Sequence, residues 1–204
     1  MFSGPWNTEF LAIDKLARHG IRTAVASYTP AMHALAIVFA LTSIITNPRV
    51  AVTDGKDTGT RAHDAVVVDP HSATAQFVKA GTPLPANERS IIIELLQPPV
   101  GPLPNTSGLP SAFDRPRIEK LLDNDRVTVW RYTWLPHQKT PVHFHANDVV
   151  VVFTADGVLA SITPDGKTTM NPNSYGLTKF SPRGRIHQEE LVKGKSSAVM
   201  VELK

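Results

Sequence analysis

The chain has 204 residues, enough for one domain with a sizeable core and additional extensions. A hydrophobic fraction of 42% argues against wholesale disorder, and a net charge of +3 with scattered Lys and Arg residues argues against nucleic-acid binding. The absence of cysteine excludes disulfides, thiolate metal ligands and cysteine nucleophiles, but it leaves the redox compartment open.

The first 52 residues, 1–52, are expected to form an extension outside the main domain. Their pattern predicts a short amphipathic helix over residues 7–20. The apolar run over residues 31–46, about 16 residues, is shorter than the roughly 20 of a spanning helix and is typical of a signal-peptide core. We therefore expect a periplasmic or secreted protein, with a cytoplasmic one as the alternative. A buried or membrane-anchoring helix is the competing interpretation, and membrane contact is expected only through residues 31–46.

Residues 53–89 are mostly polar and rich in turn signals, so they are expected to be a linker or arm with one short strand at 65–68. The run SIIIELL, residues 90–96, predicts a strand, and the proline-rich segment after it predicts an extended arm. Residues 113–125 then predict a short helix, with Asp114 as its cap and Pro116 in its first turn.

The remainder of the chain predicts strands. Residues 127–135 alternate between two faces, and further short apolar segments follow at regular spacing, separated by turn signals such as TADG and TPDGK. Many short strands without intervening helices favour an all-β antiparallel sandwich or barrel over residues 90–204.

Three histidines carry the candidate chemistry. His143 and His145 are two residues apart, so on a strand they would point to the same face. His187 follows the tight turn SPRG, which can bring it opposite the pair. Surface decoration and a hydrogen-bonded barrel histidine are the alternatives without a metal.

Downstream of the pair, the sequence resembles the second motif of the cupin superfamily. That motif is a glycine, five residues, Pro-x-Gly, two residues and a histidine, and this chain matches it at Gly176, Pro182, Gly184 and His187. The resemblance implies a small jelly-roll barrel, or double-stranded β-helix, and it covers roughly residues 127–204; the short helix expected over 113–125 precedes it.

The first cupin motif is matched in part. His143, His145 and Gly157 fit it, but its glutamate falls at Val150, or at Val149 with the shorter spacing. The resemblance implies a divalent metal held by the three histidines. Three neutral imidazoles leave open coordination positions, and the ligand set suits Fe, Mn, Ni, Zn or Cu without choosing among them.

A replacement for the missing carboxylate is expected from one of three sources. Glu189 shares the face of His187 on the same strand, so it is a candidate fourth ligand or acid/base. Asp148 would need a β-bulge to turn inward, and water is the third alternative. A solvated strand end is the competing interpretation of Glu189.

The function expected is that of a metal-dependent enzyme, of dioxygenase, isomerase or decarboxylase type by resemblance, acting on a small organic metabolite. The alternatives are a non-catalytic ligand-binding or sensing cupin and a barrel whose histidines only hydrogen-bond. Arg183 and Arg185, which flank Gly184, are candidates for binding an anionic substrate. The resemblance also implies a homodimer formed through swapped or augmented edge strands, for which residues 90–96 are the candidate.

Overall fold

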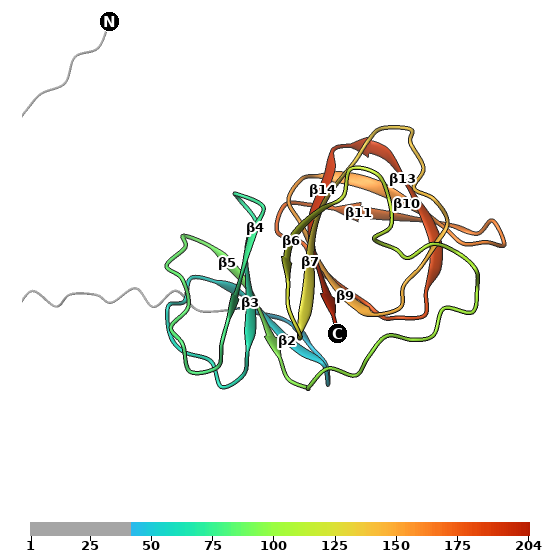
Figure 1. Ribbon diagram of the computed structural model, residues 1–204. Coiled ribbons are helices and arrows are strands. Elements are labelled where there is room, and N and C mark those ends of the chain that lie inside the picture. Colours follow the sequence, from blue (N-terminus) through green and yellow to red (C-terminus); the bar gives the residue numbers. More distant parts are fainter. Residues whose placement is uncertain (1–41) are drawn as a thin grey trace, which may run out of the picture. The chain divides into compact units, whose positions relative to one another are not determined.

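The computed structural model describes residues 42–204, which form β-strands and no helix (Figure 1). The all-β prediction is therefore confirmed for this part of the chain. The expected helix at 7–20 and most of the apolar run 31–46 lie outside the described residues, so the export signal stays a prediction. Within residues 42–204, no helix has the length and apolar character needed to cross a membrane.

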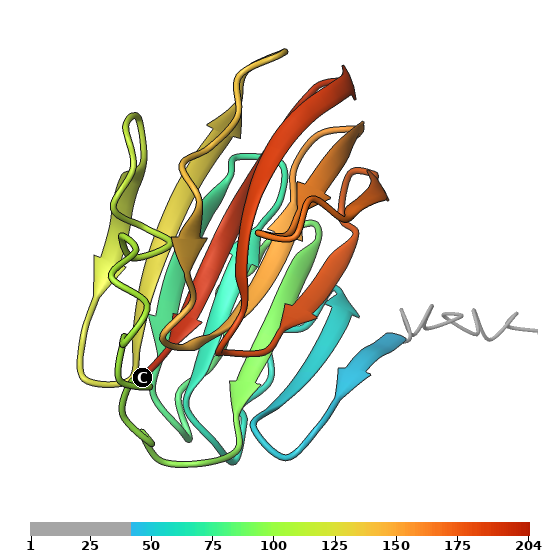
Figure 2. The ribbon, with the colours of Figure 1, turned by 90° about the vertical axis from the view of Figure 1, so that its right-hand side faces the viewer.

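Two antiparallel sheets face each other and form the barrel (Figures 1 and 2). One sheet has the order β11-β10-β13-β8, and its strands are β8 (His143–Phe144), β10 (Gly157–Ile162), β11 (Thr168–Asn173) and β13 (Ile186–Gly194). The other has the order β12-β9-β14-β7-β6, and its strands are β6 (Glu119–Asp123), β7 (Val127–Trp134), β9 (Asp148–Phe153), β12 (Thr178–Ser181) and β14 (Ser196–Leu203).

A third sheet, formed by the residues before the barrel, has the order β1-β2-β5-β3-β4. Its strands are β1 (Thr42–Thr46), β2 (Val50–Gly55), β3 (Ala65–Asp69), β4 (Thr74–Val78) and β5 (Ser90–Leu95). The strand expected at 65–68 is present as β3, but the expectation of an extension up to residue 52 and a linker over the rest of 53–89 is wrong for residues 42–89. Polar turns concealed the short strands between them, whose apolar residues become visible as a face only when the sheet assembles.

The third sheet packs against the outer face of the β9–β14–β7 sheet. Alternate apolar residues of both sheets share one buried cluster, which includes Val52, Val66 and Ile93 on one side and Val150 and Val201 on the other. On the barrel sheet, the side chains that alternate with these point the other way and form the apolar barrel interior. This double covering explains the VVVV run of β9, because a strand buried on both faces needs apolar residues at consecutive positions.

Ion pairs also join the third sheet to the barrel. The Arg49 guanidinium Nη1 lies 2.9 Å from the Asp148 Oδ2, and the Arg126 Nη1 lies 3.2 Å from the Asp64 Oδ2. All four side chains are largely shielded from solvent, which makes these pairs less sensitive to salt than exposed ones.

The short helix expected over residues 113–125 is absent, and β6 forms there instead. Arg117 has a φ of 65°, a left-handed conformation that no α-helix can contain. The register between β6 and β7 shifts between Lys120 and Leu122, so both Leu121 and Leu122 pack against the buried cluster. Apolar contact with the third sheet thus overrides the local helical signals.

Residues 90–96 are not free to pair with a second chain. Strand β5 is the centre of its sheet, with β2 on one edge and β3 on the other. The expected role of this segment as an exchanged edge strand is therefore wrong, and a homodimer stays a prediction without it.

Candidate metal centre

Two neighbouring segments place the three histidines. Strand β8 pairs with β13, and His143 lies directly opposite His187 in their register. His145 lies just beyond β8, where its N–H donates to the Arg185 carbonyl over 2.9 Å and its carbonyl accepts from the Gly184 N–H over 2.8 Å. Gly184 has a φ of 86°, so the turn before β13 needs a residue without a Cβ there. The turn that precedes His187 thus also holds His145.

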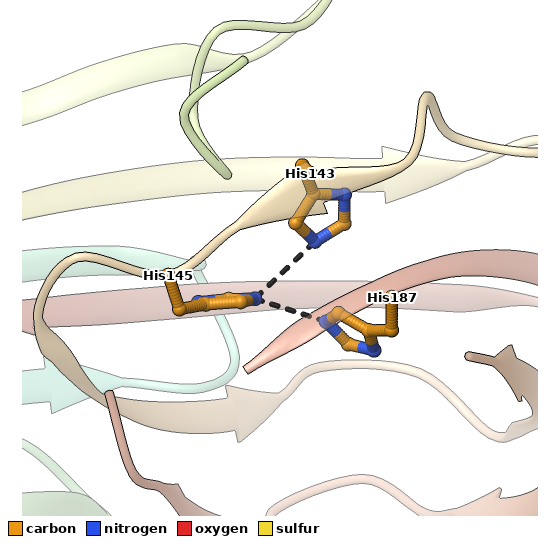
Figure 3. A group of neighbouring side chains, drawn as sticks. All are labelled: His143, His145 and His187. Carbon is orange, nitrogen blue, oxygen red and sulfur yellow. Dashed lines mark hydrogen bonds between the residues drawn. The ribbon is translucent and has the colours of Figure 1, made fainter. Parts of the chain in front are cut away.

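The three imidazoles point toward one another from these segments (Figure 3). The Nε2 atom of His145 lies 3.2 Å from that of His143 and 2.9 Å from that of His187. All three side chains are buried, and their ligand nitrogens lie within 4.8 Å of one another. An ion bound to imidazoles at about 2.1 Å would hold neighbouring nitrogens about 3.0–3.4 Å apart, so the spacing fits a single metal ion.

Hydrogen bonds orient two of the rings for this role. The Nδ1 of His143 lies 2.8 Å from the Pro141 carbonyl oxygen, which can only accept, so the proton of the neutral ring sits on Nδ1 and Nε2 carries a lone pair. The Nδ1 of His187 lies 2.8 Å from the Ser161 hydroxyl, which can accept its proton when Nε2 binds a metal, and 3.2 Å from the Arg185 Nη2, which can only donate. Such outer contacts are typical of metal-binding histidines because they fix the ring and its tautomer.

Electrostatics keeps the histidines neutral. Burial lowers the pKa of all three side chains, and it brings that of His187 to about 4, although Glu189 opposes the shift. For His145, burial and the neighbouring His143 and His187 lower the pKa to about 2. Neutral imidazole is the form that binds metals, so near pH 7 the group is ready to accept a divalent cation.

The donor set therefore fits a divalent metal. The Nε2 of His143 presents a lone pair to the Nε2 of His145 over 3.2 Å, and the Nε2 of His187 lies 2.9 Å from the same atom. Nitrogen lone pairs gathered this closely repel one another unless a proton or a cation lies among them. A metal ion ligated by His143, His145 and His187 would satisfy all three.

The solved structures to which this chain is similar include cupin proteins. No protein-family model and no curated protein matches the chain. A cupin domain from Bordetella pertussis Tohama I is 26% identical over 47% of this chain and 96% of its own, with a TM-score of 0.40. A cupin 2 conserved barrel domain protein from Leptotrichia buccalis is 12% identical over 82% and 90% of the two chains, with a TM-score of 0.44. The polyketide cyclase RemF from Streptomyces resistomycificus is 26% identical over 42% and 62%, with a TM-score of 0.34.

These matches are distant, so the strand pairing and the three histidines decide the fold. Two facing sheets bring the His-x-His segment and the Pro-x-Gly turn to one place, as the two motifs predict. The barrel is of the cupin type. Gly157, which closes the first motif, lies so close to the backbone of Lys195 that an added Cβ would meet its carbonyl oxygen at 2.2 Å. This glycine of the cupin pattern thus has a steric reason in this chain.

The missing carboxylate of the cupin motif is not replaced within the histidine group. Among the described residues, no Asp or Glu oxygen joins the three nitrogens at that spacing. Asp148 points away, as strict alternation predicted, and accepts hydrogen bonds from Arg49 and from the Arg183 N–H. Val150 packs toward the third sheet, whereas Val149 lines the barrel cavity. The cavity-facing position of the motif is therefore Val149.

Glu189 lines the same cavity but is held by other partners. Its Oε2 accepts hydrogen bonds from the Trp134 indole Nε1 over 3.0 Å and from the Arg115 Nη1 over 3.3 Å. Burial raises the pKa of Glu189, but Arg115 and the three histidines outweigh that effect and lower it to about 2. Glu189 is therefore an anion near pH 7, and its role as a ligand or as an acid/base stays a prediction.

The cavity contains functional groups that motif reasoning missed. Besides the histidines, its wall includes Ser161, Lys179 and Arg115, each from a different part of the barrel. Arg115 belongs to the segment that was expected to be a helix, and its guanidinium lies over the Tyr132 ring at 4.0 Å from the centroid. Lys179 could not be placed from the strand pattern alone. Its inward direction follows from the register of β12 against β9, in which it lies opposite Val151.

Proposed function

We propose that the protein is a metal-dependent cupin enzyme that acts on a small organic metabolite inside the barrel. The observation that carries the proposal is the convergence of three buried imidazole Nε2 atoms beside a cavity of the barrel. The cavity of about 120 Å³ is small beside ligand pockets of about 300–1,000 Å³. The substrate is therefore small.

The chain's own residues would divide the work in a simple way. A divalent ion held by the histidines would supply Lewis acidity and vacant coordination positions for a ligand. Apolar side chains of the cavity wall, among them Phe153, Leu159 and Met200, would exclude bulk water and strengthen charge interactions inside. Glu189 is the one carboxylate of this wall. Its low pKa favours a proton acceptor or a fixed negative charge over a proton donor.

A second function, ligand binding without turnover, is favoured by one specific observation. Val149 lies where the cupin pattern has a carboxylate, and Glu189 already accepts two hydrogen bonds from protein groups. A cupin with this arrangement can hold a metal and a ligand while lacking a free base.

Turnover measurements on the full chain separate these two functions. The protein would be loaded in turn with each candidate metal and incubated with a panel of small organic compounds, with product detection and oxygen uptake as readouts. The enzyme proposal predicts turnover that is lost in His145→Ala and reduced in Glu189→Gln. Binding of a panel compound without turnover under any metal would instead support the ligand-binding function.

A further inference from the structure

The barrel cavity carries more positive than negative charge. Three of the side chains in its wall are cationic, Arg115, Lys179 and Arg185, and Glu189 is the only acidic one. Arg115 is paired with Glu189, at 3.3 Å between Nη1 and Oε2, and its side chain is 4% exposed. The pair neutralises itself, so Lys179 and Arg185 remain as uncompensated charges.

Lys179 is directed into the barrel by the register of its strand. It lies opposite Val151 of β9, a residue that faces the barrel interior and lines the cavity. Its ammonium lies 5.6 Å from the centroid of the Phe153 ring, and its one hydrogen bond is a long contact of 3.4 Å to the Pro172 carbonyl. Burial lowers the pKa of this amine, in keeping with a cation that is partly removed from water.

Arg185 lines the same cavity and lies next to the three histidines. Its Nη1 donates to the Ser181 hydroxyl over 2.6 Å, and its Nη2 lies 3.2 Å from the Nδ1 of His187. Within residues 42–204, no carboxylate lies at ion-pair distance from Arg185 or Lys179. A guanidinium held in this way keeps donors for a planar anion.

We propose that Lys179 and Arg185 form a subsite for the carboxylate of a small organic acid, which lies with its carbon chain against the apolar wall of the cavity. The inference rests on the proposed function for the role of the metal, but not for the binding of the anion. Two uncompensated cations in a mostly apolar cavity attract an anion, because the lower local dielectric weakens screening. The small cavity limits the acid to a few carbon atoms.

Lys179 has one competing explanation. Strand β12 is an edge strand of its sheet, and an inward-pointing charge can protect such an edge from pairing with another chain. In that case, removal of the charge would promote self-association and leave anion binding unchanged.

The test compares carboxylates with neutral molecules of the same shape. Unbranched monocarboxylates from acetate to hexanoate and their primary amides would be titrated calorimetrically into the full chain, once metal-free and once with bound zinc. The variants are Lys179→Met, Arg185→Gln and a control, Lys167→Met, which removes an exposed lysine on the turn before β11. Zinc content would be measured for each protein.

The proposal predicts that at least one acid binds and that its amide binds at least tenfold more weakly. Lys179→Met should lower the affinity for the acid about tenfold and leave the zinc content unchanged. Lys167→Met should bind like the unmodified chain. Failure of every acid to bind, or equal affinity in Lys179→Met, would overturn the subsite. A chain that binds the acid through Lys179 but no metal would retain the subsite and refute the proposed enzyme, so the two failures are distinguishable.

Discussion

Acidification should destabilise the metal-free protein well before its carboxylates titrate. The pKa of His187 is about 4 in the folded chain against 6.5 for an unperturbed histidine, so the unfolded chain binds more protons between these values. The stability that this depressed pKa confers is complete above pH 6.5 and is lost as the pH falls toward about 4. The difference between these two pKa values corresponds to about 3 kcal/mol of stability, of which about 2 kcal/mol should be lost between about pH 7 and pH 5.

Urea unfolding of the metal-free chain across that range measures the effect. The pKa values of His143 and His145 are also lowered, so both residues should steepen the loss of stability on acidification. The lowered pKa of Glu189 affects stability only below about pH 4.5. His187→Gln should remove its share of the pH dependence. A free energy of unfolding that stays constant from pH 7 to pH 5, or an unchanged slope in His187→Gln, would refute the reasoning.

Three further predictions concern the cavity wall. Ser161→Ala should weaken metal affinity by about 10- to 100-fold in competition with a chelator, since it removes the hydroxyl beside His187, and unchanged affinity would contradict that role. Val149→Glu should leave the chain folded and tighten metal binding, because position 149 faces the cavity. Val150→Glu should lower the free energy of unfolding by more than about 4 kcal/mol, because it buries an unpaired charge between two sheets. Equal effects of the two substitutions would contradict the assigned directions of these side chains. Glu189→Gln should lower the free energy of unfolding by about 2–3 kcal/mol in urea, because its buried arginine partner loses its counter-charge, and no loss would show that the pair contributes nothing.

The barrel and its histidines could be predicted from the sequence because their signals are local. The segment of β7 alternates over eight residues, and the spacing of His143, His145 and His187 follows two compact motifs. The three histidines come together once β8 pairs with β13, and the turn at Gly184 favours that pairing.

The third sheet and the rest of the cavity could not be predicted in this way. Strands β2 to β4 are short and separated by polar turns, and their burial depends on packing against another sheet far along the chain. Arg115 and Glu189 meet although 74 residues separate them, a contact that no local pattern records. The parity that distinguishes Val149 from Val150 likewise required the observed register.

The metal content of the purified full chain tests the central claim most directly. Elemental analysis would follow metal removal and reloading with Fe, Mn, Ni, Zn or Cu, for the unmodified chain and for His187→Ala, with His71→Ala as the control. We predict one equivalent of a divalent metal in the unmodified chain and in the control, and none in His187→Ala. The absence of stoichiometric metal from the unmodified chain after every reloading, or its retention in His187→Ala, would contradict the assignment of the three histidines as one metal centre.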